Sequence, residues 1–288
     1  MSSGGSCRQA SCRERWYAFV WSTCVNPPTA RVPWSYDELV VACGLYFTLP
    51  FGQMHSRNPK IIEVAELLGR TRSSLAMKLV NFASLDPAHR ARGVKGLAGH
   101  SRGDEQVWNE FHDNWDKITV LSETKLQNLE AGHVPTVPGV SEAEPEYVAH
   151  DVPTETAATV KVRTMQSFFR KVVLAAYNSR CCISGNPVED LLVASHILPW
   201  SDFPQQRLNP KNGLCLAAHF DRAFDRRLIT FDCEMRLVLS PVLKRYLPNL
   251  AIESEFVQRE GQRLTCPDRF LPEADFLAYH RDRTLRTE

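Results

Sequence analysis

Two histidines and one asparagine in the C-terminal half have the residue types that metal-assisted hydrolysis requires. His196 lies in the run ASHILPW, Asn212 in NPKNGLCL and His219 in AHFDRAFD, with spacings of 16 and 7 residues. A neutral imidazole can take a proton from water near pH 7, and a divalent cation can offset the charge that develops on a phosphate. A side-chain amide on a facing loop can hold the base in position. This set indicates hydrolysis of a phosphodiester bond.

The elements that must position these residues are a strand, a loop and a helix. Leu191–His196 is a short apolar run that predicts a strand, Asn212-Gly213 marks a tight turn, and a helical stretch surrounds His219. This order suits a ββα finger. The other elements expected in this half are a helix at 164–177 and strand-like runs at 228–231 and 236–239.

Five motifs in this half resemble the HNH (ββα-metal) nuclease family, and more closely its restriction-endonuclease branch. The resemblance covers residues 164–285, and five motifs in the same order are far more specific than any one of them. The motifs are V-L-x-A-Y…R-C-C-I-S-G (173–185), A-S-H-I-x-P-W (194–200), N-P-x-N-G-L (209–214), H-x-x-x-x-F-D (219–225) and F-L-A-Y-H-R (276–281).

The resemblance implies a role for each of the three residues. His196 is expected to be the general base that activates water, and Asn212 is expected to hold the loop and orient His196. His219 is expected to bind the catalytic divalent ion, Mg²⁺ or Mn²⁺. The fold implied for this half is a ββα-metal nuclease domain, so the chain as a whole is expected to be α+β.

The sequence departs from the family pattern just before the expected base. Many relatives carry Asp or His there as another metal ligand, whereas this chain has Ser195. The ion could then rest on His219, water and substrate phosphate, with help from Asp221 or Asp225. The same departure supports an alternative function, a non-catalytic DNA-binding regulator with a degenerate HNH finger.

The N-terminal half is expected to be helical and to recognise the target DNA. The second and third helices, joined through Gly69-Arg70-Thr71, have the helix–short turn–helix layout of a DNA reader. Their region, 49–87, also resembles one found upstream of HNH modules in predicted restriction proteins. The expected helices are 36–46 with Ser35 as N-cap, 60–68 after Pro59, 72–82 after Thr71, and 104–117.

Exposed basic and small polar residues in and near these helices are the candidate DNA contacts. Residues at the start of the third helix could meet base edges or phosphates, and the others could add backbone contacts. Two alternatives stay open: a helical domain whose basic face binds the acidic linker or another protein, and a toxin-like nuclease with a protein-binding first domain. The candidate DNA-binding residues are Arg57, Lys60, Arg70, Arg72, Ser73, Lys78 and Arg222.

Charge is distributed unevenly although the net charge is only +1. Residues 54–102 and 161–245 each carry a net charge of +6, and residues 104–155 between them carry −10. The basic segments predict an anionic partner, although solvated surface charge would give the same pattern. The resemblance to HNH nucleases implies that this partner is double-stranded DNA. The proline-rich acidic segment predicts a linker. The expected organisation is a flexible lead-in (1–34), a DNA-recognition domain (35–120), a linker (121–160) and a nuclease domain (161–288).

Composition gives a weaker indication of the cellular setting. No apolar stretch is long enough to span a membrane, and the first residues lack the apolar stretch of a signal peptide. The nine cysteines include no C-x-x-C pair, which argues against a zinc ribbon and favours reduced, buried thiols. The resemblance to the restriction branch adds the expectation of a bacterial cytoplasmic enzyme that restricts foreign DNA, with modified DNA as one candidate target. One finger cuts one strand, so double-strand cleavage would favour a homodimer.

Overall fold

The structure is a computed structural model that describes residues 32–91, 99–132 and 157–286. Most of the expected lead-in (1–34) and the middle of the expected linker (121–160) therefore lie outside the described residues. The described residues from Trp34 onward form one compact unit that contains two clusters of buried hydrophobic side chains. No helix in the described ranges has both the length and the apolar character needed to cross a membrane.

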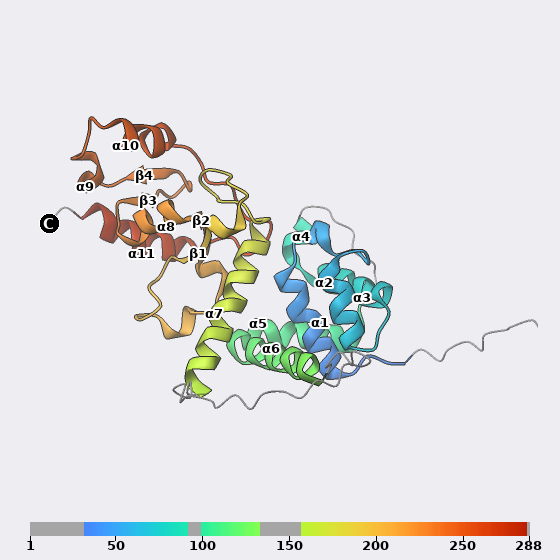
Figure 1. The fold of residues 1–288 in the computed structure, drawn as a ribbon. Helices are drawn as coiled ribbons and strands as arrows, with labels where there is room; N and C mark the ends of the chain where they lie inside the picture. The colour runs from blue at the N-terminus through green and yellow to red at the C-terminus, as the bar shows by residue number, and fades with distance from the viewer. Residues whose placement is uncertain (1–31, 92–98, 133–156, 287–288) are drawn as a thin grey trace, which may run out of the picture. The chain divides into compact units, whose positions relative to one another are not determined.

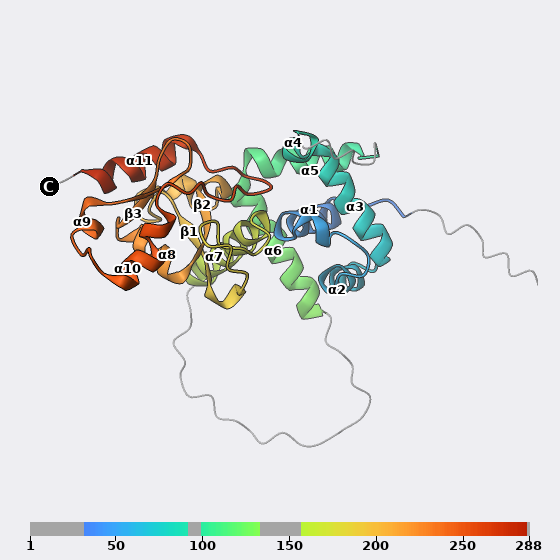
Figure 2. The same ribbon diagram turned by 90° about the horizontal axis from the view of Figure 1, so that it is seen from above.

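The N-terminal region is a group of helices packed around one central helix (Figures 1 and 2). The central helix, α1, is buried along nine consecutive residues, Leu39–Phe47, because neighbours cover it on all sides. The helices of this region are α1 (Tyr36–Thr48), α2 (Pro59–Leu67), α3 (Arg72–Leu85), α4 (Pro87–Ala91), α5 (Arg102–Asp113) and α6 (Trp115–Gly132).

Local capping signals set the starts of these helices, as the sequence predicts. Ser35 and Glu38 form a reciprocal capping box at the start of α1, and the Thr71 hydroxyl accepts from a backbone N–H in the first turn of α3. Gly69 follows α2 with φ +60°, a backbone conformation that side chains with a Cβ disfavour. The helices predicted at 36–46, 60–68 and 72–82 are confirmed within a few residues at their ends.

The last predicted helix of this region differs from the structure. The expected helix at 104–117 is two helices, because Asn114 leaves the helical conformation with φ −138° and ψ 55°. Trp115 then begins α6, which extends to Gly132. Residues 121–132, placed in the linker by composition, are therefore helical.

The C-terminal region combines helices with two small antiparallel sheets, which confirms the α+β class. The first sheet pairs β1 with β2 and the second pairs β3 with β4. Predicted strands at 191–196, 228–231 and 236–239 are confirmed. The elements are α7 (Ala157–Ala176), β1 (Leu192–His196), β2 (Gly213–Ala217), α8 (Ala218–Asp225), β3 (Ile229–Phe231), β4 (Leu237–Leu239), α9 (Pro241–Lys244), α10 (Leu250–Glu255) and α11 (Ala274–Leu285).

Helix α7 packs directly against the first sheet, and Gly213 makes this approach possible. The glycine is paired with His196 across the sheet and has extended geometry, with φ −120°. Gly213 is therefore a strand residue, and the turn expected at Asn212-Gly213 lies just before it, at Pro210–Asn212. A Cβ at this position would lie 2.4 Å from Val173 Cγ2 and 3.0 Å from Phe169 Cζ. The glycine is needed for close packing rather than for a turn.

Candidate active site

His196 is the last residue of β1, and its imidazole is fixed in orientation. The ring stacks on Phe169 of α7, with centroids 4.0 Å apart and planes 8° apart. Its Nε2 lies 2.9 Å from the carbonyl oxygen of Arg207, which can only accept a hydrogen bond. Nε2 therefore carries the proton, and Nδ1 of the neutral ring keeps its lone pair. This tautomer provides one basic nitrogen.

The surroundings of His196 keep its ring uncharged at neutral pH. Burial lowers the pKa of His196 below its ordinary value, and the hydrogen bond to Arg207 and the nearby Asp221 carboxylate offset this only in part. The neutral ring that a general base requires is therefore the main form at pH 7.

Asn212 holds the loop that follows His196, residues 197–212. Its Oδ1 accepts a hydrogen bond of 2.7 Å from the backbone N–H of Leu198, and its Nδ2 donates to the carbonyl oxygen of Gln206 at 3.1 Å. The backbone N–H of Ile197 donates to the Asn212 carbonyl oxygen at 2.9 Å. Because the side chain is buried, these bonds replace water and fix the loop beside the base.

A cavity of about 470 Å³ opens beside His196. Its walls come from β1, the loop that follows it, α8, Arg227 just beyond α8, and α11. The side chains that could act on a substrate there are Ser195, His196, Asp221, Asp225, Arg227 and Arg283.

Two carboxylates of α8 lie on the side of the helix that faces this cavity. Asp221 and Asp225 are four residues apart, so they lie one above the other on one helix face. Partial burial raises the pKa of Asp225, and the Asp221 carboxylate nearby raises it further. Two neighbouring carboxylates repel each other, and a bound cation would relieve this repulsion.

The oxygen donors in this cavity fit a hard divalent cation. The Ser195 Oγ is buried and has no hydrogen-bond partner among the residues that the structure describes, which is costly for a hydroxyl unless something else binds it. Within the described ranges no three His, Cys, Asp or Glu side chains gather closely enough to hold a metal ion. Mg²⁺ fits such a site, because it is commonly held by one or two carboxylates with water and substrate phosphate completing its shell.

His219 does not share this cavity with His196. It precedes Asp221 by two residues, which turns its side chain about 200° around the helix axis from that carboxylate. Its Nε2 lies 3.5 Å from an Oε2 of Glu255 on α10, and its side chain is 49% exposed. The packing of α8 on β1 turns Asp221 and Asp225, rather than His219, toward the cavity that His196 lines.

The comparison with protein families identifies the segment that carries this site. Residues 181–232 match the family model described as HNH endonuclease. The matched segment spans β1, β2, α8 and β3, and so includes His196, Asn212 and both aspartates of α8. No curated protein matches the chain. The matched domain therefore supports a nuclease of the HNH type.

The expected DNA contacts of the helical region divide into exposed and paired residues. Lys78 does not face outward: it is buried on the core side of α3, with its Nζ 2.8 Å from Asp104. Arg70 pairs with Glu38 at 2.7 Å. Lys60 lies 2.8 Å from Glu63 and is 39% exposed. The expected contacts that are exposed are Arg57, Arg72 and Ser73 in this region and Arg222 on α8 of the C-terminal region.

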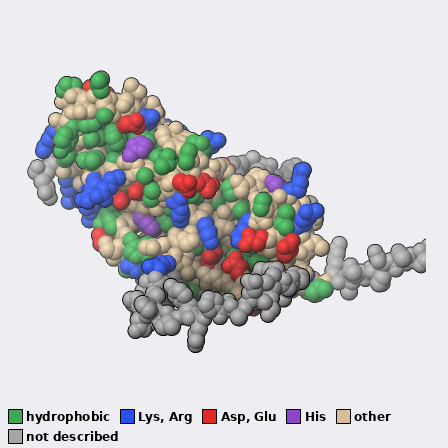
Figure 3. Space-filling model, in the orientation of Figure 1, with side chains coloured by type: hydrophobic (Ala, Val, Ile, Leu, Met, Phe, Trp, Pro, Cys, Tyr) green, Lys and Arg blue, Asp and Glu red, His purple; other side chains and the backbone are tan. Residues whose placement is uncertain are grey.

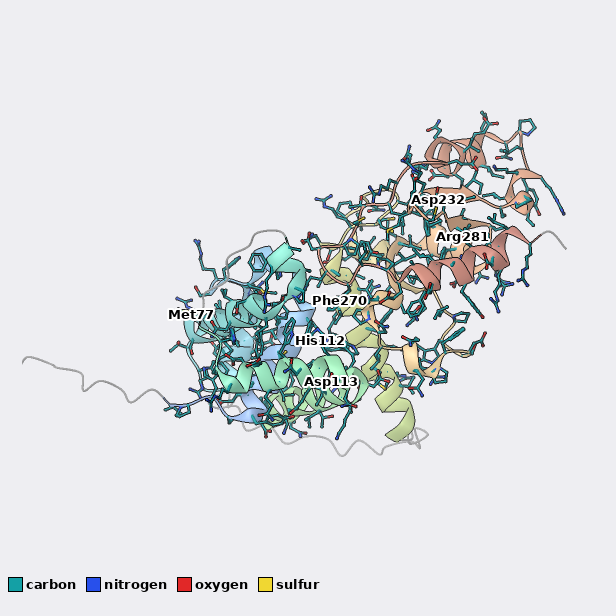
Figure 4. The ribbon with its side chains drawn as sticks, turned by 180° about the vertical axis from the view of Figure 1, so that it is seen from behind. Met77, His112, Asp113, Asp232, Phe270 and Arg281 are labelled. Carbon is teal, nitrogen blue, oxygen red and sulfur yellow. The ribbon has the colours of Figure 1, made fainter. Side chains whose placement is uncertain are left out.

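The outer face of α3 also carries an exposed apolar side chain. Met77 is 55% exposed and lies one turn after Ser73, on the outside of the helix (Figure 4). Sequence reasoning assigned this face to Lys78 instead. The helical period would place Lys78 with Leu75, Leu79 and the core, so the signal was present in the spacing.

Several residues of the site had no role assigned from the sequence. Phe169 lies in the helix predicted at 164–177, but only the tertiary structure brings it onto His196. His280 belongs to the F-L-A-Y-H-R motif and stacks on Phe224 of α8, with centroids 3.6 Å apart. Arg227 and Arg283 come from segments far apart in the sequence, so no local pattern connects them.

Proposed function

We propose that this protein is a divalent-metal-dependent DNA endonuclease. The observation that supports it is one cavity that contains a fixed neutral imidazole, that of His196, and two cavity-facing carboxylates, Asp221 and Asp225. A base next to a cation site is the minimum set for attack by water on a phosphodiester. The match of residues 181–232 to the HNH endonuclease model supports the same reaction class.

The residues of the chain act as follows. Nδ1 of His196 accepts a proton from the attacking water, while Nε2 stays bound to the carbonyl oxygen of Arg207. Asn212 is a positioning residue, because it keeps the loop that carries this carbonyl in place. Asp221 and Asp225, with the Ser195 hydroxyl, would hold Mg²⁺ or Mn²⁺. When bound there, the ion supplies positive charge against the phosphate and the leaving oxygen.

The assignment of the metal ligand thereby moves from His219 to the aspartates of α8. His219 is exposed and paired with Glu255, so it has no part in this mechanism. The carboxylate that the family pattern places before the base is replaced by two carboxylates on the helix that packs on β1. This arrangement supports an active enzyme over a degenerate finger.

We assign target recognition to α2 and α3, with Arg72, Ser73 and Met77 on the exposed face of α3. The short α2–turn–α3 arrangement supports this assignment. A role in restriction of foreign DNA, and cleavage of both strands by a homodimer, are further parts of the proposal. DNA binding by the full-length chain and by an Arg72→Ala variant, across a salt series, tests the recognition part.

A plasmid-nicking assay tests the proposed reaction. The wild type should nick supercoiled DNA with Mg²⁺ or Mn²⁺ and not with EDTA. His196→Ala should lower the nicking rate by about 10²–10⁴-fold, the range for loss of a general base, and leave binding to duplex DNA in EDTA unchanged. Wild-type nicking by this variant would overturn the assignment of the base. DNA binding without nicking in any metal would favour the regulator instead.

A further inference from the structure

Five arginines surround a second cavity next to the one that His196 lines. This cavity has a volume of about 380 Å³. The arginines come from the C-terminal ends of three helices: two directly follow α8, one follows α9, and two lie at the end of α11. We call them the arginine cluster: Arg226, Arg227, Arg245, Arg283 and Arg286. Blue side chains gather over this part of the C-terminal region in Figure 3.

The positive charge of the cluster is not balanced by ion pairs. None of the five arginines forms an ion pair with an Asp or Glu of the described residues. Arg283 lies over the ring of Tyr279, 3.4 Å from its centroid, which orients the guanidinium without neutralising it. Helix C-terminal ends carry partial negative charge, which reduces the repulsion between the arginines. The helix ends therefore gather the charges and leave them available to a ligand.

Arg227 has a backbone conformation that arginine disfavours. Its φ is +57°, in the left-handed region where glycine is the common residue after a helix. A side chain with a Cβ costs stability at such a position. Glycine at this position would remove that cost, so an Arg227→Gly substitution can separate the backbone effect from a role of the guanidinium.

The two cavities share lining residues. Arg227 and Arg283 line both the arginine cavity and the cavity that contains His196, Asp221 and Asp225. A polyanion with one phosphate at the carboxylate site would therefore present its neighbouring phosphates to the arginines. Guanidinium groups bind phosphate oxygens through paired hydrogen bonds.

We infer that the arginine cluster binds the phosphate backbone of the DNA next to the bond that is cut. This inference rests on the proposed nuclease function and deepens it. The cluster holds the strand in register with His196 and reads no bases. The nuclease domain therefore binds DNA by itself, in addition to any contact from α2 and α3.

Salt dependence of DNA binding tests the cluster. The probe is a short fluorescein-labelled duplex, bound by the full-length protein in EDTA across a salt series. The triple variant Arg226→Gln/Arg245→Gln/Arg286→Gln avoids residues that line the His196 cavity. If each arginine neutralises one phosphate, the log–log slope should become shallower by about 0.9 per arginine, about 2.7 in all, and affinity near physiological salt should fall on the order of 10²-fold.

A charge-matched triple variant provides the control. Arg180→Gln/Arg236→Gln/Arg263→Gln removes the same charge from exposed positions that line neither cavity. It should keep a slope within about half a unit of the wild type. Equal slopes for the two triple variants would overturn the inference.

Arg227→Gly separates a functional arginine from a structural one. Glycine adopts the left-handed backbone conformation without strain, so the variant should have a melting temperature roughly 2–4 °C higher. Its DNA affinity should fall, and the slope of log affinity against log salt should become shallower by about 0.9. A raised melting temperature with unchanged DNA affinity would contradict the role of Arg227.

The outcomes distinguish this inference from the proposed function. If no metal ion supports nicking by the wild type, the nuclease proposal fails. The inference that the cluster binds DNA beside the cut bond then fails with it, although the salt-dependence slopes still measure phosphate binding by the arginines. If the wild type nicks DNA and the cluster variants bind with wild-type slopes, only the arginine inference is overturned.

Discussion

His280 predicts a measurable loss of stability at acid pH. The residue lies on α11 and stacks on Phe224 of α8, so it joins the helix that carries the two aspartates to the C-terminal helix. Its Nε2 donates to the carbonyl oxygen of Phe224 at 3.0 Å, and its Nδ1 accepts from the Thr230 hydroxyl at 3.0 Å. Burial, with a smaller contribution from the charge of Arg227, lowers the pKa of His280 from 6.5 to about 4, and the hydrogen bond to Phe224 opposes this only in part.

The sign and size of the effect follow from this pKa. Below pH 6.5 the unfolded chain binds a proton at His280 that the folded protein does not bind until the pH approaches about 4. Stability from this group is therefore present above pH 6.5 and is lost as the pH falls toward 4. Each pKa unit corresponds to about 1.4 kcal/mol, so the loss amounts to about 3 kcal/mol.

The assay is urea unfolding of the wild type and of His280→Gln between pH 7 and pH 4, in EDTA. The glutamine can keep the hydrogen bond to the Phe224 carbonyl oxygen but does not titrate. Asp225, Arg227 and Arg283 line the same cavity and remain in both proteins, so their contributions largely cancel in the difference. The wild type should lose about 3 kcal/mol more than the variant over this range. If the unfolding free energies of the two proteins changed in parallel with pH, the conclusion that His280 is neutral in the folded protein would be refuted.

Three further predictions follow from the packing and the site. Lys78→Met leaves the buried carboxylate of Asp104 without its cation and should lower the free energy of unfolding by about 3–5 kcal/mol. Lys60→Met, at the exposed pair with Glu63, should lower it by at most about 1 kcal/mol. Equal losses in urea unfolding would contradict the burial of the Lys78–Asp104 pair. Gly213→Ala places a methyl group 2.4 Å from a side chain of α7, so it should cost about 1–3 kcal/mol and slow nicking, while Gly52→Ala, with open space around it, should do neither. The acid limb of the kcat/KM profile should lie below pH 6.5, because burial lowers the pKa of His196 and the base is lost as the pH falls; an acid limb above pH 7 would contradict this.

Local signals in the sequence were sufficient for much of the fold. Ser35 and Thr71 start helices through bonds within a few residues, and Gly69 ends one through its own backbone. Such features do not depend on the rest of the chain, so sequence reasoning could place them. The break at Asn114 was missed because the apolar residues on either side of it continue one helical pattern, and only their packing on α1 requires the turn.

The sequence was sufficient to predict which residue types form the site, but not which side of α8 faces His196. His196 and Asn212 depend on a strand and a loop that the sequence indicates clearly, and the structure places them together. His219 and Asp221 are two residues apart and therefore lie on opposite sides of α8. The sequence alone thus indicates that only one of them can face His196. Which one does so is decided by the packing of α8 on β1 and α11, which is tertiary information.

Metal binding by the aspartates of α8 is the central claim. Isothermal titration of Mn²⁺ into the full-length protein with bound duplex DNA measures it directly, in a His196→Ala background that prevents cleavage. The account predicts loss of the Mn²⁺ signal in Asp221→Asn/Asp225→Asn and its retention in His219→Ala. Retention in the aspartate variant, with loss in His219→Ala, would contradict it.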